Sequence, residues 1–172
     1  MAATVATAAS STITTAASST NSGIPSIPPN VLTGIAYLCN TDANRSVMCW
    51  YDNASASSDG ITPPQATDPV GPSDSVVTWE GQVVRGIIMP SDSPTDFSTN
   101  IGLDGATAPF QSQVGTASLL LLPAPGQPAS TSYYADFNVF KDDLRVLYTD
   151  GQFGQVYSVY YCLFANSFHG LG

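Results

Sequence analysis

Residues 31–51 read VLTGIAYLC-NTDANR-SVMCWY, and this stretch decides the fold class. Val31–Cys39 and Ser46–Tyr51 are runs rich in apolar, β-branched and aromatic side chains, while Asn40–Arg45 between them is mostly polar. Two such runs joined by a short polar segment are typical of a β-hairpin. The stretch therefore predicts two antiparallel strands with a six-residue connection.

The chain downstream of this hairpin alternates apolar runs with turn residues in the same way. Glu80-Gly81 predicts a second hairpin between Ser75–Trp79 and Gln82–Met89, because an acidic residue followed by Gly favours a two-residue turn. Further strands are expected at Phe97–Leu103, Val114–Leu122, Tyr133–Phe140, Leu144–Tyr148 and Gln155–Phe164. The remaining segments are expected to be a long loop at residues 52–74, a rigid turn at Pro123–Pro128 and a polar tail at residues 165–172.

The composition disfavours helices. Glu80 is the only Glu among 13 acidic residues and Lys141 is the only Lys, so the side chains that favour exposed helix faces are scarce. Thirteen Pro and 14 Gly favour turns. Without helical crossovers, neighbouring strands are expected to pair antiparallel. We therefore predict an all-β fold, an antiparallel β-sandwich or jelly-roll-like domain, with a partial propeller or a barrel as the alternative.

The N-terminal region differs in composition from the rest. Residues 1–23 are low-complexity Ala, Thr and Ser, and the following stretch to residue 30 is rich in Pro. Such a segment buries too little apolar surface to fold alone. We expect residues 1–30 to be an arm that contacts neighbouring subunits, and residues 31–172 to be a single β domain.

The charge pattern excludes several classes of partner. Only 10% of the residues are charged, and the net charge is −9. Four fixed cations are too few for a nucleic-acid surface or for docking on anionic membranes. The longest apolar runs, such as Leu119–Leu122, are too short to span a bilayer. We therefore expect neither nucleic-acid nor membrane partners.

The residue types that carry catalysis and metal binding are also scarce. The only His is His169, no G-x-S-x-G motif occurs, and no carboxylate pair stands out. The three Cys residues have no zinc-site spacing. Cys39 and Cys49 are either a disulfide across the first hairpin or, with Cys162, buried free thiols. We expect no enzymatic activity, metal or cofactor.

Aromatic and polar residues gather at the ends of two predicted hairpins. Trp50 and Asp52 lie at one end, and Arg145, Tyr148 and Asp150 lie at another. An aromatic ring face beside oriented polar groups is the chemistry that binds carbohydrate. These five residues are the candidate ligand-binding site.

These observations favour a structural, self-assembling protein, such as a coat, capsid or surface-layer component that forms homo-oligomers. A secreted lectin or adhesin that binds a glycan is the alternative. Both fit an extracellular or virion-surface location. Two Asn-X-Ser sequons, at Asn44 and Asn53, are as many as chance predicts in a chain this rich in Asn, Ser and Thr.

Overall fold

A computed structural model describes residue 27 and residues 29–90, 94–122 and 132–170. The predicted arm, residues 1–30, and the predicted turn at Pro123–Pro128 thus lie mostly or wholly outside the described residues. The strands are β1 (Ile35–Thr41), β2 (Ser46–Tyr51), β3 (Ala66–Val70), β4 (Val83–Ile88), β5 (Thr95–Ile101), β6 (Gln113–Leu121), β7 (Tyr133–Lys141), β8 (Val146–Asp150) and β9 (Gly154–Gly170). Among the described residues, helical structure includes the single turn α1 (Pro29–Thr33) and the short 3-10 turns η1 (Ala54–Ser58) and η3 (Gly105–Thr107).

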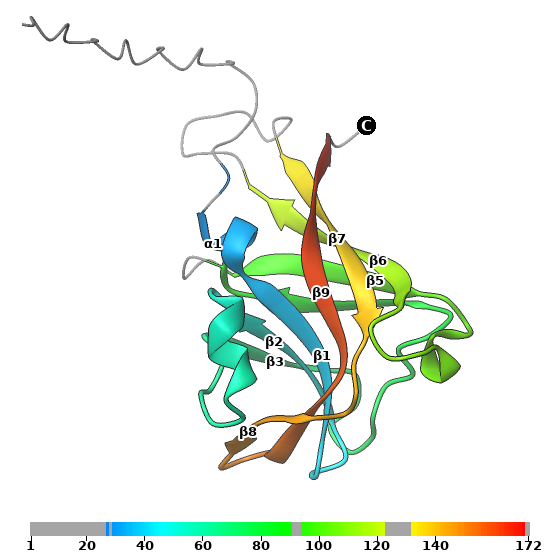
Figure 1. The fold of residues 1–172 in the computed structure, drawn as a ribbon. Helices are drawn as coiled ribbons and strands as arrows, with labels where there is room; N and C mark the ends of the chain where they lie inside the picture. Colours follow the sequence, from blue (N-terminus) through cyan, green and yellow to red (C-terminus); the bar gives the residue numbers. More distant parts are fainter. Residues whose placement is uncertain (1–26, 28, 91–93, 123–131, 171–172) are drawn as a thin grey trace, which may run out of the picture.

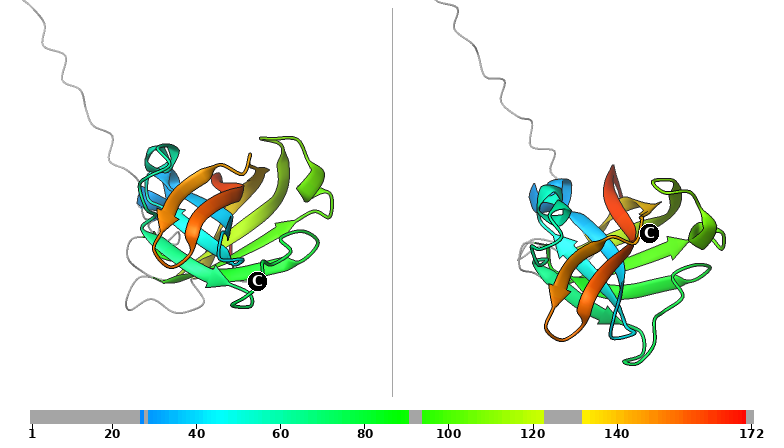
Figure 2. Two further views of the ribbon diagram at one scale, coloured as in Figure 1. Left: turned by 90° about the horizontal axis from the view of Figure 1, so that it is seen from below. Right: turned by 60° about the horizontal axis from the view of Figure 1, so that its bottom comes forward.

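The strands form one antiparallel sheet that is nearly closed into a barrel (Figures 1 and 2). The order is β3-β2-β1-β9-β7-β6-β5-β4, and β8 pairs with β9 outside this path. The long β9 pairs with β1 along one edge, and with β8 and then β7 along the other. The predicted all-β antiparallel fold is confirmed, in its barrel form.

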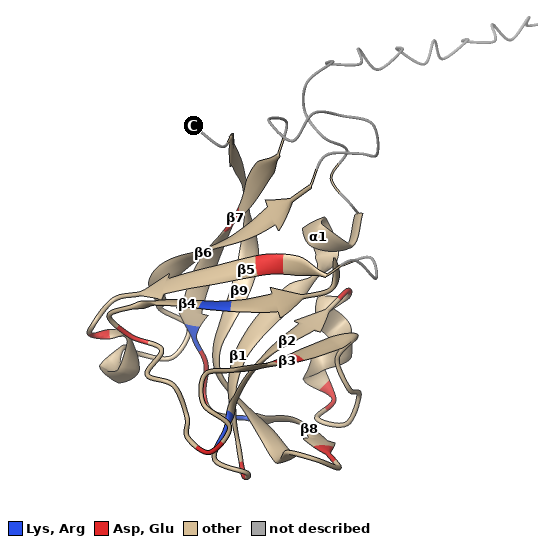
Figure 3. Cartoon of the chain, turned by 180° about the vertical axis from the view of Figure 1, so that it is seen from behind, with Lys and Arg blue, Asp and Glu red and all other residues tan. Residues whose placement is uncertain are grey.

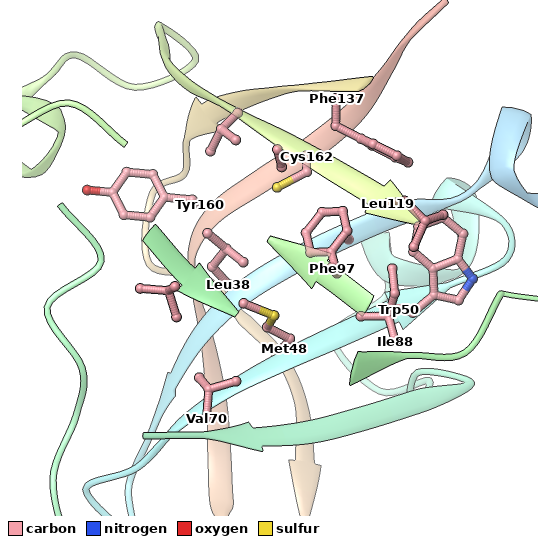
Figure 4. Close-up of a cluster of buried hydrophobic side chains, with 14 of the residues drawn as sticks. Leu38, Met48, Trp50, Val70, Ile88, Phe97, Leu119, Phe137, Tyr160 and Cys162 are labelled. Atoms are coloured by element: carbon pink, nitrogen blue, oxygen red, sulfur yellow. The ribbon is translucent and has the colours of Figure 1, made fainter. Parts of the chain in front are cut away.

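The barrel interior is filled with side chains from alternate positions of the strands. Trp50 of β2, Phe97 of β5 and Phe137 of β7 meet there, with edge-to-face ring contacts of 6.3 Å between Trp50 and Phe137 and 5.5 Å between Phe97 and Phe137 (Figure 4). Leu38, Met48 and Leu119 are wholly buried around them. Burial of this many apolar side chains is the main source of folding free energy.

A second apolar cluster lies on the other face of β1 and β2. It joins Tyr37 and Tyr51 from these strands to Leu147 and Tyr148 of β8, with η1 packed against it through Ala54. Every residue of β2 is therefore buried. A strand covered on both faces reads as a continuous apolar run, which is why SVMCWY is such a strong strand signal.

The first and last strands of the path meet without a backbone ladder. The backbone N–H of Ile87 on β4 donates a 2.7 Å hydrogen bond to Oδ2 of Asp68 on β3. Gly86 allows this approach, because a Cβ atom there would lie 2.7 Å from Met48 Sδ and 2.8 Å from Val70 Cγ1. The Asp68 side chain thus joins β3 to β4 at the seam of the barrel, which is the place where these two end strands meet without a backbone ladder.

The structure corrects the predicted second hairpin. Residues 75–79 form no strand, and β4 pairs with β5 instead. Trp79 is 2% exposed, and its Nε1 donates to Asn40 Oδ1 at 3.2 Å. The apolar character of this segment therefore reflects packing onto the barrel and not strand pairing.

Two predicted irregular segments contain regular structure. The expected loop at residues 52–74 includes η1 and β3, and the expected tail at residues 165–172 is part of β9 as far as Gly170. The predicted strand at Val31–Cys39 begins only at Ile35, because α1 precedes it. The three cysteines are free and buried, so the structure has no Cys39–Cys49 disulfide.

Candidate functional site

A hollow of about 310 Å³ lies on the outer face of the sheet. Its lining comes from four strands and the end of β9, namely Arg85, Asp96, Phe97, Ser98, Ser118, Tyr134 and His169. Figure 3 shows this side of the molecule as mostly uncharged, with a basic position on β4 beside an acidic position on β5. A concave surface with a few polar groups is the ordinary form of a small-ligand site.

Strand alternation supplies the polar lining. Phe97 and Leu119 point into the barrel, so Ser98 and Ser118, their neighbours in the chain, point outward. Antiparallel register then aligns one residue from each strand in a row across the sheet. This row is Arg85, Ser98, Ser118 and Asp136.

Asp136 holds His169 at one end of the hollow. Its Oδ1 lies 2.8 Å from His169 Nδ1, and its Oδ2 accepts a 2.7 Å hydrogen bond from Ser167 Oγ. The imidazole stacks on the Tyr134 ring, with centroids 5.1 Å apart and planes at 21°. Tyr134 and His169 are directly opposite in the β7–β9 ladder, so this stack follows from the register. The result is an oriented pair of flat rings at the sheet surface.

The other polar side chains of the hollow have no hydrogen-bonding partner among the described residues. Within the described part of the chain, Arg85, Asp96, Ser98 and Ser118 form no side-chain hydrogen bond or ion pair. The other three fixed cations each have a protein partner: Arg45 lies over Phe153, Lys141 lies over Tyr160, and Arg145 pairs with Asp142. Arg85 thus differs from the other three cations in having neither a ring contact nor an ion pair with the described residues.

The hollow does not have the geometry of a nucleophilic active site. Among the described residues, His169 has Asp136 as its one hydrogen-bonding partner, and no hydroxyl lies within hydrogen-bond distance of it. Activation of a serine requires a base in contact with the hydroxyl. The described residues also contain no group of three or more His, Cys, Asp or Glu side chains close enough to hold a metal ion.

Two of the five predicted site residues form a structural pair. Trp50 is fully buried, and its Nε1 donates a 2.7 Å hydrogen bond to Oδ1 of Asp52. The same Oδ1 accepts a 2.9 Å hydrogen bond from Asn30 on α1. Asp52 therefore fastens α1 to the end of β2, and no face of the Trp50 ring is open to a sugar.

Arg145 belongs to a largely buried polar network beside β8. Its Nη2 donates to Tyr37 Oη at 2.7 Å and its Nη1 to the Ser57 carbonyl at 3.0 Å, while Nε lies 3.6 Å from Asp142 Oδ2. Asp142 is 5% exposed and also accepts from Ser158 Oγ. Burial raises the pKa of Tyr37 above its ordinary value.

Tyr148 and Asp150 also have structural partners. Tyr148 is 2% exposed, its Oη lies 2.9 Å from Thr67 Oγ1, and burial raises its pKa. Asp150 Oδ1 accepts from the backbone N–H groups of Gln152 and Phe153, at 2.6 and 2.9 Å, and so caps the β8–β9 turn. The structure therefore does not gather the five predicted residues on one open surface.

Sequence reasoning missed His169 because residues 165–172 were expected to be a tail. One signal was available in the sequence: Phe168 stands between the polar residues Ser167 and His169, a short apolar–polar alternation. In the structure Phe164 and Phe168 pack on the core, while Ser167 and His169 are exposed. Such alternation is typical of a strand and indicates that the strand predicted at Gln155–Phe164 continues beyond Phe164.

Comparison of the chain with protein-family models, curated proteins and solved structures finds no match. Within the described residues, no helix has both the length and the apolar character needed to cross a membrane.

Proposed function

We propose that this chain is a non-enzymatic recognition domain that binds carbohydrate in the hollow on the outer face of β4, β5, β6, β7 and β9. The observation that carries the proposal is the group of unengaged polar side chains, Arg85, Asp96, Ser98 and Ser118, beside the stacked rings of Tyr134 and His169.

The chemistry of a sugar matches this lining. Its C–H faces pack on flat rings, and its hydroxyls donate to and accept from side chains. Asp96 supplies two acceptor oxygens, Arg85 supplies donors only, and Ser98 and Ser118 supply both. A ligand with many hydroxyls can satisfy all four side chains together, whereas an apolar ligand would leave them desolvated and unpaired.

The test is a glycan array followed by titration calorimetry with the best-bound glycan. Asp96→Asn and Arg85→Ala should each weaken binding about tenfold, the effect of losing one charge-assisted hydrogen bond of about 1.5 kcal/mol. Asp104→Asn is the matched control, because Asp104 is exposed at η3 with no side-chain cap hydrogen bond and lies outside the hollow lining. The proposal fails if no glycan is retained, or if Asp96→Asn and Arg85→Ala bind as tightly as the unaltered chain.

Self-association is the second candidate function. Val83, Ile87 and Met89 are 55%, 46% and 38% exposed at β4 and just beyond it, in an alternating outward-facing pattern. Apolar side chains grouped in this way favour contact with a second copy of the chain. Light scattering after size-exclusion chromatography should then report an oligomer that Val83→Thr with Ile87→Thr shifts toward the monomer. A monomer at all concentrations, with residues 1–26 present, would exclude this function.

A further inference from the structure

The two sequons of the chain have different surroundings in the folded protein. Asn53-Ala54-Ser55 follows β2 and enters η1, and Asn44-Arg45-Ser46 lies in the turn between β1 and β2. Both asparagines are exposed. Exposure alone therefore does not distinguish them, but the partners of their amide and hydroxyl groups do.

At Asn53 the amide nitrogen is available. The Oδ1 atom accepts hydrogen bonds from the Ser55 backbone N–H at 3.0 Å and from Ser55 Oγ at 2.8 Å. The Nδ2 atom forms no hydrogen bond with the described residues. Ser55 is itself exposed, so both side chains of the sequon face solvent.

At Asn44 the amide nitrogen and the sequon hydroxyl both form hydrogen bonds within the protein. Its Nδ2 donates a 2.7 Å hydrogen bond to the carbonyl of Asp74. The sequon hydroxyl, Ser46 Oγ, is fully buried, donates to Asn40 Oδ1 at 2.8 Å and accepts from the Val77 N–H at 3.0 Å. Ser46 thus helps to hold the segment that carries Trp79 against the barrel, and the folded hairpin removes it from solvent.

We propose that Asn53 is an acceptor for an N-linked glycan and that Asn44 is not. The donor is an oligosaccharide joined through a diphosphate to a lipid, and a transferase of the secretory pathway catalyses the step. The Asn53 Nδ2–C1 bond forms, the C1–O bond to the diphosphate breaks, the amide nitrogen loses one proton, and the lipid diphosphate leaves. The modification applies to chains delivered to a compartment that holds this donor.

The fold accommodates a glycan at this position. η1 packs over the outer face of β1 and β2 through Ala54 and Ala56, whereas the hollow lies over β4–β7 and the end of β9. A glycan on Asn53 therefore leaves the hollow open. The inference rests on the two sequons alone and does not depend on carbohydrate binding by the chain.

The experiment expresses the full chain behind a cleavable secretion leader in yeast, with an Asn-Gly-Thr tag appended at the C-terminus. Only molecules whose tag is glycosylated are analysed, because the tag reports delivery to the compartment. Intact mass before and after amidase treatment should show one glycan besides that of the tag. Asn53→Gln and Ser55→Ala should each remove it, and Asn44→Gln should leave it in place. A chain that carries the tag glycan alone, or one that loses a glycan in Asn44→Gln, would overturn the inference.

Discussion

Asp68 on β3 and Ile87 on β4 are joined by a 2.7 Å hydrogen bond from the backbone N–H of Ile87 to the Asp68 carboxylate. This bond spans the seam of the barrel, where the strands lack a ladder. Asp68→Ala leaves the Ile87 N–H without its partner, and we expect the free energy of unfolding to fall by about 1–2 kcal/mol. Asp68→Asn keeps an acceptor oxygen and should lose less. Urea denaturation measures both, and equal midpoints for Asp68→Ala and the unaltered chain would show that the seam does not need this bond.

Gly86 is required at the same seam. A Cβ atom there would lie 2.7 Å from Met48 Sδ and 2.8 Å from Val70 Cγ1, which are both closer than real contacts allow. Gly86→Ala should lower the free energy of unfolding by about 1–3 kcal/mol, the usual effect of overpacking. Gly151→Ala is the control, because a Cβ at Gly151 meets nothing within 4 Å. Thermal melts of the two variants should differ clearly, and a shared melting temperature would contradict the seam geometry.

A substitution at Asp52 can test whether this residue of the predicted site stabilises the fold or binds ligand. Asp52→Ala removes the acceptor of the buried Trp50 indole N–H, so we expect a loss of about 1–3 kcal/mol in stability. Glycan affinity in the hollow should not change, because Asp52 is not among its lining residues. Denaturation and calorimetry on the same sample check both outcomes. Reduced affinity with unchanged stability would restore Asp52 as a ligand-binding residue.

Asp59, in the loop after η1, should make the stability of the folded protein depend on pH in the acid range. The Thr62 hydroxyl and the N–H groups of Thr62 and Ile61 donate to its carboxylate and lower its pKa from 3.8 to about 2. A depressed carboxyl pKa stabilises the folded state above the unfolded value, so this contribution is present above about pH 4 and is lost as the pH falls toward 2. Asp59→Asn should therefore be less stable than the unaltered chain at pH 6 and equally stable near pH 2. Denaturation at both pH values tests this, and a pH-independent difference would exclude the linkage.

The three thiols should be inert in the native protein. Cys39, Cys49 and Cys162 are wholly buried, and burial raises the pKa values of Cys39 and Cys162. Cys39 faces Val47 and Cys49 faces Tyr37 in the β1–β2 ladder, so the two cysteines are diagonal neighbours and not a facing pair. A thiol-specific chromogenic reagent should detect none of the thiols in buffer and all three in guanidinium. Detection of one thiol in guanidinium without reductant would indicate that a disulfide forms.

The sequence predicted the elements whose own side chains determine their conformation. Ser46–Tyr51 was found because each of its side chains is apolar or fits a buried strand, and the β1–β2 hairpin follows from it. β3 was missed because Ala66-Thr67-Asp68-Pro69-Val70 contains Asp and Pro, which disfavour strands, and its pairing with β2 overrides that preference.

The candidate site depends on contacts that no local pattern contains. Tyr134 and His169 face each other only because β7 and β9 pair. Arg85 lies in one row with Asp136 only through the β4–β5, β5–β6 and β6–β7 registers. Trp50 and Tyr148 have the composition of a sugar platform, but their burial is decided by the strands that cover them. The sequence shows which residues are aromatic. Whether an aromatic ring is buried or exposed depends on which strands and loops cover it, and that requires knowledge of the strand order.

The alternation of buried and outward positions on β4, β5 and β6 has a practical consequence for protein engineering. Phe97 of β5 and Leu119 of β6 pack inside the barrel, while Ser98 and Ser118 of the same strands and Arg85 of β4 face outward. Random libraries restricted to these outward positions would alter the lining of the hollow while leaving the packed side chains in place. The domain, whose three cysteines are all buried, is thus a scaffold on which new binding specificities can be selected.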